Sequence, residues 1–218
     1  MKIIDPSYKV LYPYEFSART GKTILRQIEL AARTCYKSEN KITDESAEEL
    51  VKLLIKKGHH AMLEFGPSIT IKFICNRGFS HELVRHRIAS VDPNSYAQES
   101  TRFCNYSQDK FGEEITVIRP IYFQKNTEPY DLWYEAMITA ERCYLGLINL
   151  GMLPEQARGV LPIDLKTEIN IKANIREWRH ILNLRTSNVA HPQMRQLMRP
   201  LCQEFKKKIP VLFDDINY

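Results

Sequence analysis

The sequence lacks the features that mark membrane-spanning, secreted and metal-stabilised proteins. No apolar run approaches the length of about 20 residues that a transmembrane helix needs. The opening residues, MKIIDPSYKV, have no apolar core of the kind found in signal peptides. The 5 cysteines are dispersed and form no CxxC pair, which argues against both a disulfide framework and a zinc site. We therefore expect a cytoplasmic protein that binds no metal.

Internal repeats and low-complexity linkers are also missing, and charge of one sign is not in large excess. A chain of 218 residues suits one domain with a sizeable core, so we predict a single domain over residues 1–218. The formal net charge of +5 fits anionic small ligands as well as nucleic acid. Charge alone therefore does not choose between an enzyme and a nucleic-acid-binding module.

Hydrophobic periodicity predicts a mixture of helices and strands. Apolar residues recur at helical spacing in segments 21–34, 44–57, 130–150, 174–185 and 194–208. Alternation of apolar and polar residues predicts strands at 68–75, 114–120 and 167–172, and residues 1–14 look extended. We predict an α+β fold, with helices around a mixed or antiparallel sheet.

Three helix starts are marked by capping residues. Ser46 and Glu49 have the spacing of a capping box, and Asn174 stands three residues before Glu177. Ser80 is placed to cap a short helix that carries His81 to Arg87. These positions predict where the polar segments described next enter and leave helices.

The stretch VRHRIASVDPNSYAQESTRF, Val84 to Phe103, concentrates hydrogen-bonding groups. Its arginines, Arg85, Arg87 and Arg102, offer rigid guanidinium forks that suit phosphate or carboxylate. Two interpretations stay open from spacing alone. The segment is either an anion site or a solvated loop of salt bridges.

A second polar cluster lies far along the chain, at Asn174, Arg176, His180 and Arg185, with Arg158 between the two clusters. Any one of these arginines is explained by a surface ion pair that contributes little to stability. Together they suggest more phosphate-binding capacity than a single mononucleotide requires.

Several blocks resemble the flavin-dependent thymidylate synthases. HELVRHRIAS followed by SYAQESTRF is similar to the family signature, which reads Arg-His-Arg, seven residues, Ser, and an Arg two positions later. The stretch before it, and the blocks EQARGVLP, NIREWRHILNLRTS and AHPQMRQL, also resemble the family. The resemblance runs from about Gly58 to Pro200, and its blocks in this order are highly specific.

The resemblance implies an α+β homotetramer whose active sites are shared among subunits. Each site would hold FAD, dUMP and a folate. Methylenetetrahydrofolate would supply the one-carbon unit, NADPH would reduce the flavin, and the flavin would deliver hydride to give dTMP. Neither nucleic acid nor a membrane would be a partner.

The family motifs also imply residue roles. The flavin-binding positions correspond to Arg85, His86, Arg87, Asn174, Arg176 and His180. The dUMP-binding positions correspond to Glu82, Gln98, Ser100, Arg102, Arg158 and Arg185. Arg185 and Ser100 would be catalytic, and the Arg185 guanidinium would stabilise negative charge developing on a pyrimidine carbonyl oxygen.

Three departures from the family pattern bear on function. About five extra residues fall within Ser90–Ser95, where Asp92-Pro93-Asn94 has turn chemistry, and we align the signature serine with Ser100 rather than Ser95. Phe65 replaces a common histidine, and a phenyl ring cannot donate a hydrogen bond or move a proton. Gln98 stands where many members have Glu, so both uracil and cytosine rings are conceivable ligands.

These departures motivate an alternative function. A flavin-dependent relative with impaired hydride transfer would let water capture the methylene adduct, giving hydroxymethylated dUMP or dCMP. A third hypothesis is a nucleic-acid-binding module or a nucleotide-binding protein without catalysis. The mixed charge of the chain and the lack of a repeat of aromatic and basic residues argue against nucleic acid.

Overall fold

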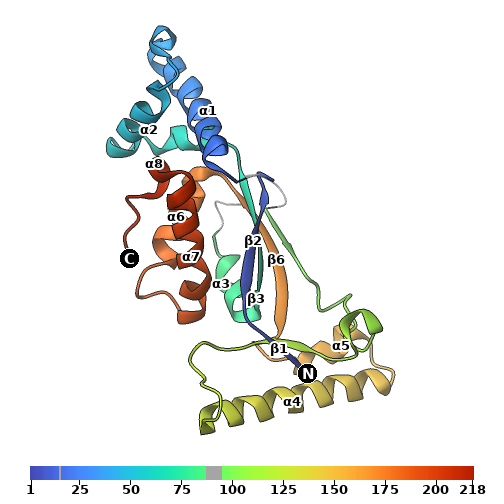
Figure 1. The fold of residues 1–218 in the computed structure, drawn as a ribbon. Coiled ribbons are helices and arrows are strands. Elements are labelled where there is room, and N and C mark those ends of the chain that lie inside the picture. Colours follow the sequence, from blue (N-terminus) through green and yellow to red (C-terminus); the bar gives the residue numbers. More distant parts are fainter. Residues whose placement is uncertain (15, 87–94) are drawn as a thin grey trace. The chain divides into compact units, whose positions relative to one another are not determined.

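The structure is a computed structural model that describes residues 1–14, 16–86 and 95–218 (Figure 1). Arg87 and most of the extra segment within Ser90–Ser95 therefore lie outside the described residues. His86 and Ser95, on either side of that gap, are both described.

The described chain contains strands, α-helices and short 3₁₀ turns. The strands are β1 (Lys2–Ile4), β2 (Ser7–Tyr12), β3 (Ile69–Asn76), β4 (Tyr96–Gln98), β5 (Thr116–Ile118) and β6 (Lys166–Ala173). The helices are α1 (Ala18–Tyr36), α2 (Ser46–Lys56), α3 (Arg77–Leu83), α4 (Glu128–Asn149), α5 (Pro154–Ala157), α6 (Ile175–Arg185), α7 (Pro192–Lys208) and α8 (Pro210–Phe213). The 3₁₀ turns are η1 (Glu39–Lys41), η2 (His60–Phe65), η4 (Asp109–Phe111) and η5 (Arg158–Val160).

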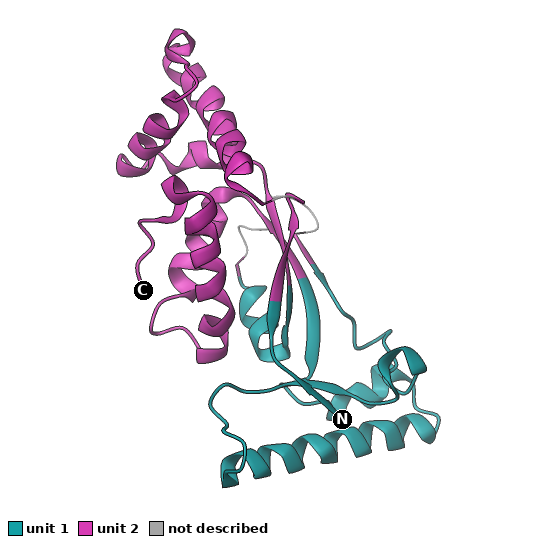
Figure 2. Cartoon of the chain, viewed as in Figure 1, with its two compact units in different colours: residues 1–7, 73–85, 97–169 teal, residues 8–72, 86–96, 170–218 magenta. Residues whose placement is uncertain are grey.

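The chain divides into two compact units (Figure 2). Unit 1 comprises residues 1–7, 73–85 and 97–169, and unit 2 comprises residues 8–72, 86–96 and 170–218. One sheet has the strand order β2-β3-β6-β4, and each of its strands carries residues of both units. The prediction of a single domain over residues 1–218 is not decided by this division and stays a prediction.

Unit 1 is built around the long helix α4 and the short strands β1 and β5. The two strands pair in parallel, with Ile3 opposite Val117. The apolar stripe of α4 buries Trp133, Met137 and Tyr144 against Val117 and neighbouring residues. This packing confirms the predicted stripe at residues 130–150, although Leu150 at its end is 83% exposed. Gly151 follows with φ of 88°, a conformation that glycine adopts without steric cost.

Unit 2 is mainly helical, with α6 and α7 packed side by side (Figure 1). Trp178 of α6 is fully buried and donates from Nε1 to the carbonyl of Ile69 at 2.9 Å. Since a buried indole N–H needs a partner, this bond ties α6 to the start of β3. The inward face of α6 also buries Ile175 and Leu182, as its periodicity predicts.

The predicted α+β fold is confirmed, and each predicted helix and strand over residues 21–75 and 114–208 has a counterpart in the structure. Two of the three predicted caps are wrong. Ser46 accepts from the Thr43 amide at 2.8 Å and donates to Glu29 at 2.7 Å, so it serves the turn before α2. Ser80 lies inside α3, which begins earlier because Asn76 caps it by accepting from the Phe79 amide at 2.8 Å. The Asn174 cap is confirmed.

None of the described helices is both long and apolar enough to cross a bilayer. The cytoplasmic location stays a prediction.

Candidate active site

The sequence-predicted site residues fall in both units. In unit 2 they gather around α6, whose first turn is fixed by Asn174. The side chain of Asn174 accepts from the Glu177 amide at 2.9 Å, which satisfies one of the free N–H groups at the helix start. This cap sets where Arg176, His180 and Arg185 emerge along the helix.

Arg185, the last residue of α6, is held by a histidine. Its Nε donates to Nε2 of His86 at 2.9 Å. His86 is 6% exposed, and the Tyr96 hydroxyl donates to its backbone carbonyl at 2.9 Å. The predicted flavin-binding His86 and the predicted catalytic Arg185 are therefore in direct contact.

His86 is a neutral imidazole at physiological pH. Burial, together with the positive charge of Arg185 and the nearby His180, lowers the pKa of His86 to about 4. The ring of His180 meets that of His86 edge-on, with centroids 5.8 Å apart. An arginine always donates, so the bond from Arg185 requires a lone pair on Nε2 of His86. The single proton of the neutral ring is then on Nδ1.

Glu177 lies on the other side of His86. Its Oε1 is 3.8 Å from Nδ1 of His86 and is buried without a hydrogen-bond partner among the described residues. Burial raises the pKa of the Glu177 carboxyl, while His180 and Arg176 act in the opposite direction. An orphaned carboxylate oxygen in the interior is costly, so its position calls for an explanation.

His86, Glu177 and His180 also have the residue types of a metal site, with ligand atoms within 4.8 Å of one another. A metal ligand must offer a lone pair. The bond from Arg185 leaves the lone pair of His86 on Nε2 and the proton on the nitrogen that faces Glu177. The geometry thus favours a histidine–carboxylate pair at this place.

A cavity of about 460 Å³ opens beside this cluster. It is lined by both polar and apolar atoms, from His60, Leu63, Arg176, Glu177, Arg179, His180, Asn183, Asp215 and Ile216. Arg176 is exposed and donates to Glu64 at 2.6 Å. Such a mixture of donors and an apolar wall suits part of a large anionic ligand that carries a ring.

In unit 1, Gln98 is anchored to two hydroxyls. Its Nε2 donates to Ser80 Oγ at 2.8 Å and to Thr167 Oγ1 at 3.2 Å. The hydroxyl of Ser80 donates to the carbonyl of Arg77 at 3.0 Å, so it can only accept from Gln98. The amide orientation is therefore fixed, and among the residues that the structure describes no donor reaches Oε1 of Gln98.

Ser100 and Arg102 share a tight turn in which Ser100 Oγ accepts from the Arg102 amide at 3.2 Å. The preceding Glu99 anchors this turn, since its carboxylate accepts from Tyr106 at 2.9 Å and from Lys166 at 2.8 Å. Burial opposes the charge on Lys166, but its bonds to Glu168 and Glu99 prevail and raise its pKa. The bonds to Glu99 thus hold the start of the turn in place, while the Arg102 side chain is exposed.

Arg102 donates from Nε to Glu155 at 2.6 Å. Glu155 belongs to α5, and Arg158 follows three residues later at the start of η5. The ion pair brings Arg102 next to the segment that carries Arg158. Glu82 lies in α3, and Arg85 follows that helix with its side chain exposed. The ligand-binding roles of these residues stay predictions.

Sequence reasoning missed the residues that hold the predicted ones in place. Glu177 was noted only as a helix-start residue, although its spacing of three from His180 puts both on one face of α6. Glu64, Glu99 and Glu155 are separated by 112, 67 and 53 residues from Arg176, Lys166 and Arg102, respectively, so no local pattern signals these pairs.

Comparison with known proteins identifies the family. The family model described as thymidylate synthase complementing protein matches residues 20–211. A protein of Pyrococcus furiosus named flavin-dependent thymidylate synthase is 31% identical over 180 residues, which cover 83% of this chain and 69% of that protein. One of Corynebacterium aurimucosum with the same name is 30% identical over 207 residues, covering 87% of this chain and 79% of the relative.

A solved structure shares the fold. The UMP/dUMP methylase PolB from Streptomyces cacaoi, solved with 5-Br dUMP, superposes with a TM-score of 0.74 at 19% identity. The match covers 98% of this chain and 96% of that one. The chain therefore belongs to the thymidylate synthase complementing protein family, as its resemblance to flavin-dependent thymidylate synthases predicts, and is an enzyme of the methyltransferase class.

Proposed function

We propose that the protein is a flavin-dependent thymidylate synthase that converts dUMP to dTMP. Methylenetetrahydrofolate would be the one-carbon donor, and FAD reduced by NADPH would be the hydride donor. The observation that carries the proposal is the contact between Arg185 and the buried His86, because it fixes a guanidinium at the end of α6 in a chain of this family. The names of the relatives from Pyrococcus furiosus and Corynebacterium aurimucosum support the same reaction.

The residues around α6 fit a flavin dinucleotide. Arg176 and His180 line the cavity of about 460 Å³ and supply donors for the pyrophosphate, and Leu63 and Ile216 supply an apolar wall for a ring. When bound, the flavin would supply the hydride chemistry. The cavity suits part of a dinucleotide, which agrees with the proposal that a site is completed by other subunits.

The chain's own residues would bind and polarise the nucleotide. Arg102 and Arg158 would hold the phosphate, with Ser100 as a further hydrogen-bond donor in the same turn. Arg185 would donate to a pyrimidine carbonyl oxygen and stabilise the negative charge that develops there, which raises the nucleophilicity of the adjacent carbon. Its fixed link to His86 would keep the guanidinium oriented during the reaction.

We also propose that the protein assembles as a homotetramer. The helix α4 exposes Leu132, Tyr134 and Ile138, at 62%, 42% and 37%. A hollow of about 530 Å³ on the same helix is lined mostly by Leu132, Ala136, Ala140 and Val160. Leu132, Ala136 and Ala140 lie on one face of α4, whereas Tyr134 and Ile138 lie on another, and exposed apolar side chains grouped on a helix face are typical of an interface between copies. Sedimentation of wild type and of Leu132→Glu tests this assignment, and an unchanged mass would contradict it.

The hydroxymethylase alternative rests on Phe65. This residue ends η2 with a 62% exposed ring, at the position where the family pattern described above commonly has a histidine. A phenyl ring offers no proton to the one-carbon chemistry. Product analysis separates the two reactions, because hydroxymethylated dUMP or dCMP without dTMP would replace the main proposal.

The first experiment is a visible absorption spectrum of the protein after FAD is added and the excess is removed, followed by titration with dUMP. We expect retained flavin bands that shift with dUMP. Turnover with methylenetetrahydrofolate and NADPH should then give dTMP. Failure to retain flavin together with no response to dUMP would overturn the proposed function.

A further inference from the structure

The buried carboxylate of Glu177 lies beside the ring of His86. Glu177 is 3% exposed, and within the part of the chain that the structure describes its Oε1 has no hydrogen-bond partner. Nδ1 of His86 lies 3.8 Å from this oxygen. A hydrogen bond between them needs a separation of about 3 Å, so a side-chain movement of less than about 1 Å would form it.

The position of the proton on His86 decides whether the ring can donate to Glu177. Arg185 donates to Nε2, so the proton of the neutral ring is on Nδ1, the atom that faces Glu177. A proton on the other nitrogen would put two donors, Nε–H of Arg185 and Nε2–H of His86, against each other. The Nδ1–H tautomer thus allows both the bond from Arg185 and the pairing with Glu177, and the Nε2–H tautomer abolishes both.

We infer that Glu177 is a positioning residue that selects the Nδ1–H tautomer of His86 and thereby holds the Arg185 guanidinium in the orientation used on the substrate. The carboxylate attracts the Nδ1 proton, the free Nε2 lone pair then accepts from Arg185, and the hydroxyl of Tyr96 fixes the backbone of His86. The order Glu177, His86, Arg185 forms a chain in which Glu177 acts on the Arg185 guanidinium through His86. The substrate role of Arg185 rests on the proposed function, whereas the tautomer of His86 does not.

Other groups around His86 do not replace Glu177. His180 meets the ring edge-on, and its contribution to the pKa of His86 has the same direction as that of Arg185. Arg176, on the same helix, is engaged with Glu64 at 2.6 Å. The carboxylate of Glu177 is thus the acceptor close to Nδ1 among the described residues that contact this histidine.

The test compares Glu177→Leu and Glu177→Gln with wild type in protein labelled with ¹⁵N-histidine. The chemical shifts of the two ring nitrogens report the tautomer, and the variant His86→Gln identifies which signals belong to His86. We expect Nδ1–H in wild type at pH 7, loss of that single tautomer in Glu177→Leu, and its retention in Glu177→Gln, because an amide oxygen also accepts. Glu48→Gln is the control, since Glu48 forms an exposed pair with Lys52 on α2.

Turnover gives the second readout. Carboxylates that orient metal-bound histidines contribute roughly 10- to 100-fold to activity, and we expect an effect of the same order for this histidine. We expect kcat of Glu177→Leu to fall by that factor with little change in the dUMP KM, and Glu177→Gln to recover most of it. An Nε2–H tautomer in wild type, or a retained Nδ1–H tautomer in Glu177→Leu, would overturn the inference. Failure of wild type to bind flavin would instead overturn the proposed function, since the tautomer is measured without any ligand.

Discussion

The amide of Gln98 donates from Nε2 to Ser80 at 2.8 Å, and the hydroxyl of Ser80 donates to the carbonyl of Arg77 at 3.0 Å. Because the serine proton is already used, a carboxylate in place of the amide would face an oxygen lone pair. We predict that Gln98→Glu lowers the free energy of unfolding by about 1 kcal/mol, the lower end of the effect of a mismatched polar group, because Gln98 is only partly buried.

Urea unfolding of the variant checks this prediction. Gln108→Glu is the matched control, because Gln108 is exposed in the same unit and the same atoms are exchanged. An unfolding midpoint of Gln98→Glu equal to that of the control would show that the amide orientation does not depend on Ser80. The same variant, assayed with dUMP and dCMP, would also reveal whether position 98 selects the pyrimidine.

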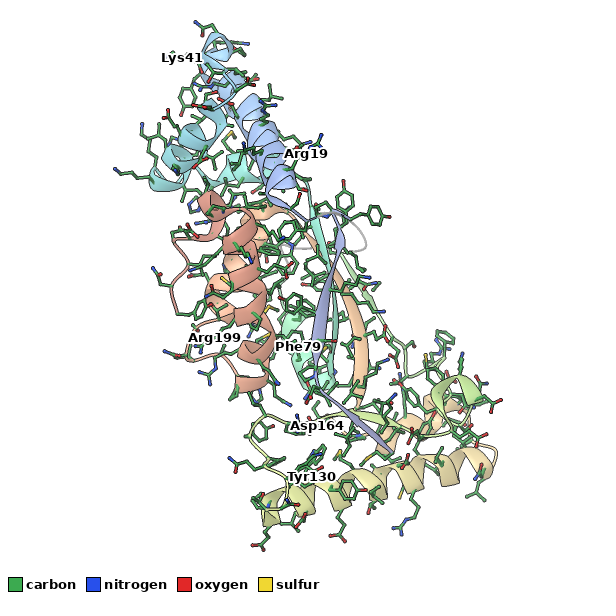
Figure 3. All side chains as sticks on the ribbon, in the orientation of Figure 1. Arg19, Lys41, Phe79, Tyr130, Asp164 and Arg199 are labelled. Atoms are coloured by element: carbon green, nitrogen blue, oxygen red, sulfur yellow. The ribbon has the colours of Figure 1, made fainter. Side chains whose placement is uncertain are left out.

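The carboxylate of Asp164 joins three segments of unit 1 and is labelled in Figure 3. It accepts from Asn76 Nδ2 at 2.7 Å and from the Trp133 indole at 2.9 Å, and Asn76 in turn caps α3. We predict that Asp164→Ala destabilises the protein by about 3 kcal/mol, because two buried donors lose their acceptor. Asp164→Asn should have a smaller effect, since its amide retains one acceptor oxygen.

Chemical denaturation measures both variants against Asp5→Ala. Asp5 pairs with Arg119 at 2.7 Å on the surface of the same unit, where such a pair contributes about 1 kcal/mol or less. Equal stabilities of Asp164→Ala and Asp5→Ala would mean that the Asp164 network does not hold unit 1 together.

Arg102 provides a test of the predicted phosphate site. We predict that Arg102→Gln weakens dUMP binding roughly 10- to 100-fold, the loss expected for one charge-assisted hydrogen bond. Arg102→Lys should recover part of the affinity, because an amine keeps the charge but not the fork. Flavin retention should not change in either variant.

The dUMP-dependent shift of the flavin spectrum measures this affinity. Arg119→Gln removes another exposed arginine, whose partner is Asp5, and it serves as the control. If Arg102→Gln and Arg119→Gln bind dUMP alike, the Ser100–Arg102 turn is not the phosphate site.

The sequence was sufficient to predict the helices and strands and the cap of α6. These features depend on local periodicity and on residues three positions apart. It predicted α6 over residues 174–185, and the helix extends over Ile175–Arg185. The cap of α3 was placed at Ser80 because serine is a frequent N-cap residue. The choice of Asn76 depends on Asp164, which is 88 residues away and orients the asparagine side chain.

In the candidate site, too, local motifs could be predicted from the sequence and long-range contacts could not. The motif blocks identified His86 and Arg185, but only the fold shows that they touch, since 99 residues separate them. The carboxylates that pair with the predicted Arg176 and Arg102, Glu64 and Glu155, belong to segments remote in sequence from those arginines. Tertiary pairing of this kind has no local periodicity, so pattern reading could not find it.

The C-terminal segment is tied to α6 by an ion pair that gives a pH-dependent stability. Arg179 donates to both carboxylate oxygens of Asp215, at 2.8 and 2.6 Å, and also to the carbonyl of Leu212. These bonds lower the pKa of Asp215, despite a smaller opposing effect of burial. A carboxyl with a lowered folded-state pKa adds stability above its unfolded pKa of about 4 and loses it as pH falls through the folded value.

We predict that Asp215→Asn is less stable than wild type at pH 7, by about 1 kcal/mol or less because the pair is partly exposed. The difference should shrink as the pH is lowered below about 4. Urea unfolding of wild type and Asp215→Asn from pH 7 to pH 3 measures it, with Asp44→Asn, at a 96% exposed side chain, as the control. A difference that stays constant over this range would assign the effect of the substitution to packing rather than to the charge of Asp215.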